Sequence, residues 1–215
     1  ANPSHVPYAA GGVPANEARR AINEPDFRAH WNPRARGVEF STQPGEYFFG
    51  RRRVLDDLAA FLEHAGDDRT RIVTGTPGAG KSAILSRIVV ASALPGSVLE
   101  SAAPAIDLAI HAQGKSLDDV TKRFAAALDC EATTELVLAR LQSSTAPFRV
   151  IVDALDEAAE PATIAERLLQ PLNEIDNVKL VVGTREGYID ALPGGEIIDI
   201  DRDDYASEQD IADYV

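Results

Sequence analysis

Cysteine and methionine are almost absent from the sequence: it has one cysteine, Cys130, and no methionine at all. A single cysteine cannot form an internal disulfide, and no Cys-x-x-Cys pair or Cys/His cluster is available to hold zinc. No apolar run approaches the roughly 20 residues that a membrane helix needs, and the N-terminus lacks the pattern of a signal peptide. We therefore expect a protein of the reducing cytoplasm that has no membrane partner.

Basic residues are scarce relative to acidic ones. The 215 residues include 21 Lys and Arg against 34 Asp and Glu, which gives a formal net charge of −13. Of the basic residues, only Arg202 lies between Glu186 and Val215, a stretch that is rich in acids. Such a surface repels a nucleic-acid backbone, so we expect no nucleic-acid partner.

The length allows one full domain with residues left over. Residues 1–45 contain many prolines and glycines, which predicts an irregular N-terminal arm with a single short helix around residues 15–22. Because this region and its border also contain Phe27, Trp31, Phe40 and Tyr47, we expect the arm to pack on the core domain, residues 46–215. The sequence lacks an initiator methionine and ends within an apparent helix, so we expect a piece of a longer protein.

Hydrophobic periodicity alternates between that of helices and that of strands. Helices are expected at residues 53–66, 82–93, 116–128, 133–141 and 161–169, and strands at residues 71–74, 106–111, 148–152, 178–182 and 196–200. Alternation of this kind predicts an α/β fold, in which a mainly parallel five-stranded sheet lies between two layers of helices.

A complete phosphate-binding loop of the form GxxxxGKS lies between the strand at 71–74 and the following helix. It comprises Gly75, Thr76, Pro77, Gly78, Ala79, Gly80, Lys81 and Ser82. Backbone N–H groups of such a loop and the positive end of the helix surround a phosphate. Lys81 is then expected to reach the β and γ phosphates, and Ser82 to place its hydroxyl on Mg²⁺.

Acidic residues follow the buried strand at 148–152, at the edge where ligands of such sheets bind. Asp153 is the candidate for supporting the magnesium shell. Asp156 and Glu157 are both candidates for orienting the water that attacks the γ-phosphate, although either one is also explained as an acidic helix cap. Arg185 follows the next buried strand and either contacts the γ-phosphate or is a solvated surface residue.

Four segments together resemble the nucleotide-binding domain of the STAND class of P-loop ATPases, which are relatives of NACHT, NB-ARC and AAA+ modules. The segments are FFGR at 48–51, GTPGAGKS at 75–82, VIVDALDE at 150–157 and VVGTR at 181–185. The resemblance implies that Phe49, Gly50 and Arg51 lie near adenine and ribose, and that Arg185 senses the γ-phosphate. Its implied cofactors are ATP or ADP with Mg²⁺.

The resemblance also implies a switch: ADP holds a closed form, and exchange for ATP opens the protein and drives homo-oligomerisation of the parent. The implied partners are helical and winged-helix domains after the core and an effector domain before it. Two other functions stay open from the residues, namely a P-loop kinase acting on a small acceptor and a nucleotide-binding interaction domain without turnover. A ring-forming translocase or unfoldase is a further alternative, disfavoured by the acidic C-terminal stretch.

Overall fold

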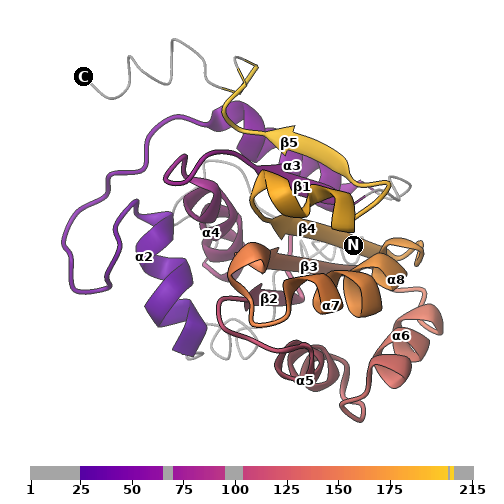
Figure 1. Ribbon diagram of the computed structural model, residues 1–215. Coiled ribbons are helices and arrows are strands. Elements are labelled where there is room, and N and C mark those ends of the chain that lie inside the picture. Colours follow the sequence, from indigo (N-terminus) through magenta and orange to yellow (C-terminus); the bar gives the residue numbers. More distant parts are fainter. Residues whose placement is uncertain (1–24, 65–69, 95–103, 203, 206–215) are drawn as a thin grey trace, which may run out of the picture.

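The chain folds around a five-stranded sheet in which every strand is parallel to its neighbours (Figure 1). The computed structural model describes residues 25–64, 70–94, 104–202 and 204–205. The strands are β1 (Arg71–Thr74), β2 (Leu108–His111), β3 (Phe148–Asp153), β4 (Val178–Gly183) and β5 (Glu196–Asp199). Their order across the sheet is β2-β3-β4-β1-β5, so the expected parallel five-stranded sheet is confirmed.

The central strands are apolar along their whole length because both faces of the sheet are covered. Every residue of β4 is buried, and in β3 only Arg149 is partly exposed. Val150 and Val152 belong to the core cluster on one face, whereas Ile151 between them belongs to the cluster on the other face. The molecule is therefore the expected three-layer α/β/α sandwich.

Each face of the sheet carries its own set of helices. One core cluster contains α5 (Leu117–Leu128), α6 (Thr134–Gln142) and the continuous helical run formed by α7 (Pro161–Ile164), η3 (Ala165–Leu169) and α8 (Gln170–Asn173). The other contains α3 (Arg52–Glu63) and α4 (Lys81–Ala93). Two short 3-10 turns, η2 (Leu155–Glu157) and η4 (Glu186–Ala191), follow β3 and β4. None of the described helices is both long enough and apolar enough to cross a membrane.

A helical segment at residues 27–35 was not expected from the sequence. It consists of a π-helical turn, η1 (Phe27–Trp31), that continues into α2 (Asn32–Ala35). Pro33 has no backbone N–H group to donate, and it directly follows the π-helical turn, a local irregularity that interrupts the regular helical hydrogen-bond pattern. Phe27, Trp31 and Ala35 are buried in the same cluster as α4.

Two aromatic residues that follow this segment are exposed. Phe40 and Tyr47 are 59% and 58% exposed, so these two aromatic residues do not pack into the core. The helix expected at 15–22 and the helical C-terminal end lie outside the described residues. The domain boundary between residues 45 and 46 stays a prediction.

Candidate functional site

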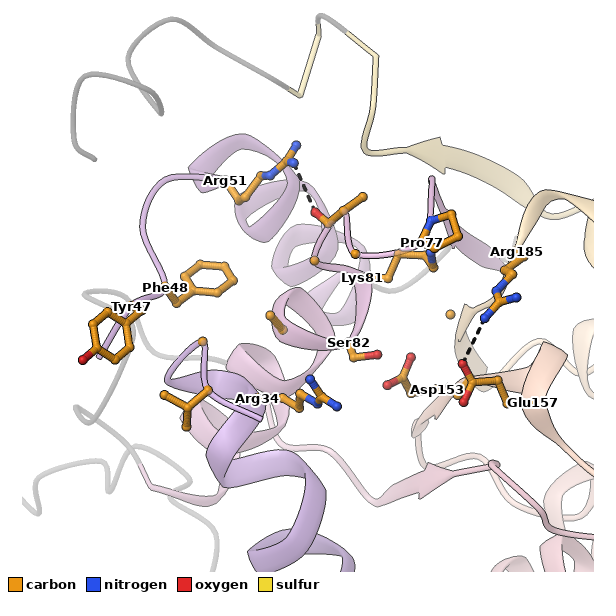
Figure 2. A pocket seen from close by; sticks show the side chains of 18 of the residues that line it. Arg34, Tyr47, Phe48, Arg51, Pro77, Lys81, Ser82, Asp153, Glu157 and Arg185 are labelled. Atoms are coloured by element: carbon orange, nitrogen blue, oxygen red, sulfur yellow. Dashed lines mark hydrogen bonds and ion pairs between the residues drawn. The ribbon is translucent and has the colours of Figure 1, made fainter. Parts of the chain in front are cut away.

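Three neighbouring strands end at one edge of the sheet and bring distant sequence segments together. β1 leads into the glycine-rich loop, β3 ends at Asp153, and β4 ends at Gly183, two residues before Arg185. Because parallel strands have all their carboxyl ends at the same edge, these segments surround one cleft of about 540 Å³ (Figure 2).

The loop after β1 has the backbone that a phosphate cradle needs. Gly80 has a φ angle of +100°, which L side chains rarely adopt, and it caps the N-terminus of α4. In this conformation the first turn of α4 lines the cleft and directs the positive end of its dipole there. The Lys81 ammonium group donates hydrogen bonds to the carbonyl oxygens of Gly75, at 2.7 Å, and Thr76, at 3.2 Å. A cation and a helix N-terminus thus face the same space.

The Asp153 carboxylate at the end of β3 is almost completely buried, with 2% of its side chain exposed. Its Oδ2 lies 2.9 Å from Nε2 of His30, which comes from the η1 segment. The His30 ring stacks on His111, with the ring centroids 3.6 Å apart. Burial, and secondarily the neighbouring His30, lower the pKa of His111 to about 4. The partly buried His111 ring therefore supports the His30 ring that contacts Asp153.

Backbone strain follows Asp153 directly. Ala154 has a φ angle of +56°, in the left-handed region that costs non-glycine residues about 1 kcal/mol or more. A small side chain limits this cost, and the turn directs Asp156 and Glu157 into the cleft. The small side chain of Ala154 is thus explained by the left-handed backbone conformation at this position.

Arg185 forms ion pairs with both acidic residues of η2. Its Nε lies 2.9 Å from Oδ2 of Asp156, and its backbone N–H donates to Oδ1 of the same carboxylate at 3.2 Å. Its Nη2 lies 3.4 Å from Oε1 of Glu157, as the dashed line in Figure 2 marks. The Asp156 side chain is 6% exposed and the Glu157 side chain 38%. Asp156 is therefore the anchor of Arg185, and Glu157 is the more accessible acid.

Arg51 connects the glycine-rich loop to the segment after β5. Its guanidinium group donates hydrogen bonds to the backbone carbonyls of Ala79, Ile200 and Tyr205, at 3.2, 2.6 and 3.3 Å. Asp201, which follows Ile200, accepts a hydrogen bond from the backbone N–H of Thr76. This bond holds the pKa of the Asp201 carboxyl below its usual range. Arg51 thus holds the loop at Ala79, and Asp201 holds it at Thr76.

A known protein family matches most of the chain, including the segments that surround the cleft. Residues 37–197 match the family described as Novel STAND NTPase 1. The chain belongs to this STAND NTPase family. It is therefore a nucleotide-binding P-loop NTPase domain.

Curated sequences and solved structures were compared as well. A search of curated protein sequences found no match. Among solved structures, C. elegans PCH-2 is similar with a TM-score of 0.39 and 12% identity, over 69% of this chain and 42% of that chain. The chain thus spans less than half the length of that protein.

Most of the predicted site residues of this STAND NTPase line the cleft. They are Phe49, Arg51, Pro77, Gly78, Ala79, Gly80, Lys81, Ser82, Asp153, Asp156, Glu157 and Arg185. Gly50 and Gly75 do not line it; Gly75 contributes the carbonyl that receives Lys81. The roles given to these residues stay predictions.

Several other residues at the site could not be predicted from the sequence. Arg34 and Val38 line the cleft from the N-terminal side, and His30 contacts Asp153. None of these residues belongs to a recognisable motif. The only signal for this region was its aromatic content, which indicated packing but no place in the cleft.

Proposed function

We propose that this domain binds ATP and ADP with Mg²⁺, hydrolyses ATP slowly, and serves as a conformational switch in a larger protein. The observation that carries the proposal is the convergence of the phosphate-binding loop, Asp153 and the Arg185 ion pairs on one cleft. Its volume of about 540 Å³ suits a nucleotide, since small-molecule pockets measure roughly 300–1,000 Å³.

Lys81 and the helix N-terminus supply the phosphate affinity. Lys81 now donates to two carbonyl oxygens of its own loop, and an ammonium group has three donors on a flexible stem. A bound β or γ phosphate would receive one of these donors together with the loop N–H groups. The loop carbonyls hold Lys81 close to the place where the phosphates would lie, which reduces the entropy lost on binding.

The donor set at the metal end fits a hydrated magnesium ion. Ser82 and Asp153 both line the cleft, and Figure 2 shows them close to each other there. Within the described part of the chain, Oδ1 of Asp153 has no hydrogen-bond partner, and no cluster of three or more His, Cys, Asp or Glu side chains forms a metal cage. Magnesium needs only one or two protein oxygens besides water and phosphate. When bound, the ion would neutralise phosphate charge.

The acidic residues and Arg185 supply the chemistry of hydrolysis. Glu157 is the better candidate for orienting the attacking water because its side chain is 38% exposed, against 6% for Asp156. Both oxygens of Asp156 contact Arg185, whereas Glu157 contacts Arg185 through Oε1 and accepts a hydrogen bond from Gln113 at Oε2. A γ-phosphate would compete with Glu157 for the guanidinium group, since each is an anion. Arrival of ATP would then release Glu157 toward the water and alter the turn after β4. This exchange of partners is the proposed switch element.

The first experiment is to denature the purified protein, separate the released small molecules and identify any nucleotide. Copurified ADP at near one per chain would support a switch that rests in its product-bound state. Calorimetric titration with ATP and ADP, with and without Mg²⁺, then measures affinity for the emptied protein. Failure to bind under all conditions would leave only an interaction domain without nucleotide.

The Lys81→Ala variant tests the phosphate-binding assignment. We expect it to abolish detectable nucleotide binding because it removes the main cation facing the phosphates. Lys122→Ala is the matched control, because Lys122 is 60% exposed on α5 and pairs only with Asp118 among the described residues. Unchanged affinity in Lys81→Ala would refute the assignment.

A further inference from the structure

Arg34 is a cation at the phosphate end of the cleft that belongs to none of the sequence motifs. It is half-buried on α2 and lines the cleft together with Ser82 and Asp153. Figure 2 shows its side chain extending toward the part of the cleft where these two residues lie. In a P-loop protein this part receives the terminal phosphate and its magnesium ion.

The segment that carries Arg34 is fixed against this end of the site. His30 lies one helical turn before Arg34, so the two side chains share a face, and His30 contacts Oδ2 of Asp153 at 2.9 Å. At the other end, Arg87 of α4 donates a hydrogen bond to the carbonyl of Ala35 at 3.2 Å. Trp31 is 1% exposed between these two contacts. The backbone that positions Arg34 is therefore held by polar contacts at both ends and by burial in the middle.

The cations that line the cleft differ in their partners. Arg185 is paired with two carboxylates, and Lys81 donates to two carbonyl oxygens. The guanidinium group of Arg34, in contrast, has no hydrogen-bond or ion-pair partner within residues 25–64, 70–94, 104–202 and 204–205. A guanidinium group has five N–H donors in a planar arrangement that suits a bidentate oxyanion.

We propose that Arg34 binds the terminal phosphate of a nucleoside triphosphate and thereby distinguishes triphosphate from diphosphate. The inference rests on the proposed function, because it requires a nucleotide in the cleft. Arg34 can engage the phosphate without breaking an ion pair, whereas Arg185 must leave Asp156 or Glu157. The helical segment before the matched family region would thus be part of the nucleotide site and would link the γ-phosphate to the N-terminal side of the chain.

The test compares the affinity for ADP with that for an ATP analogue whose β–γ bridging oxygen is replaced by an imido group, which prevents hydrolysis. Titrations with Mg²⁺ are made on the wild-type protein, Arg34→Gln and Arg34→Lys. Arg28→Gln is the matched control, since Arg28 is an exposed arginine of the same segment that does not line the cleft. Urea unfolding of each variant verifies that it is folded.

We expect Arg34→Gln to weaken binding of the triphosphate analogue about tenfold or more and binding of ADP less than about twofold, because only the former carries the phosphate that Arg34 contacts. Arg34→Lys should recover part of the loss, and Arg28→Gln should match the wild type. Equal losses for the two nucleotides, or no loss, would overturn the assignment of Arg34 while leaving the proposed function intact. Absence of binding to the wild type would instead refute the proposed function.

Discussion

Replacing Gly183 with alanine tests how tightly the end of β4 is packed against Asp153 at the cleft. A Cβ atom on Gly183 would lie 2.6 Å from Oδ1 of Asp153 and 2.6 Å from Cδ1 of Leu85. Both distances are far below the roughly 3.5–4.0 Å at which a carbon atom normally packs against other heavy atoms. Leu85 is fully buried and Asp153 is held by His30, so neither neighbour can withdraw freely.

The expected cost of Gly183→Ala is that of overpacking a dense core, about 1–3 kcal/mol. With a urea dependence of roughly 2 kcal/mol per M, this loss lowers the midpoint of urea unfolding by about 0.5–1.5 M. The assay uses the fluorescence of Trp31, the single tryptophan of the sequence, which is buried and should report its exposure on unfolding. The variant should also bind nucleotide with Mg²⁺ more weakly, because displacement of Leu85 or Asp153 alters the site.

Gly187→Ala is the matched control for this prediction. An added Cβ there meets no atom within 4 Å, and its backbone conformation suits an L residue. Its unfolding free energy should stay within about 0.5 kcal/mol of the wild type. If Gly183→Ala unfolds at the same urea concentration as Gly187→Ala, the close packing of β4 against Asp153 is refuted.

The remaining predictions concern hydrolysis and a helix cap. Glu157→Gln should leave ATP affinity within about twofold and slow hydrolysis roughly 100-fold or more, since a group that accepts a proton from water is lost. Asp156→Asn should also bind ATP but turn over more slowly, because Arg185 loses its anchor; if neither variant slows single-turnover hydrolysis, water activation belongs to another residue. Ser116→Ala removes the cap of α5, where the Ser116 hydroxyl accepts from the Asp119 N–H while the Asp119 carboxylate accepts from the Ser116 N–H. It should cost about 1 kcal/mol in urea unfolding, and no change would show that the capping box contributes nothing.

Much of the fold could be predicted because its elements depend on local patterns. The apolar runs at 148–152 and 178–182 indicated buried strands, and the structure has β3 and β4 there, each one residue longer. The helix expected from residue 116 is α5, which begins directly after its N-cap, Ser116. The phosphate-binding loop was also readable, because its chemistry requires fixed residue types within eight consecutive positions.

The order of the strands and the partners of the site residues could not be predicted from the sequence. Nothing local indicates that β1 lies between β4 and β5, because strand order depends on how crossover helices pack. The ion pairs of Arg185 with Asp156 and Glu157 likewise join residues from different strand ends. Sequence reasoning therefore identified these three residues as separate candidates but not as one charged group.

The position of the helical segment at residues 27–35 depends on the tertiary structure and not on a local sequence pattern. The α/β alternation, the phosphate-binding loop and the acid at the end of β3 could be predicted from the sequence, since each depends on neighbouring residues. Only the tertiary structure brought His30 to Asp153, across 123 positions, and Arg34 into the cleft. The physical reason is that burial of Phe27 and Trp31 against α4 fixes where this segment lies, and such packing between distant residues leaves no periodic signal in the chain.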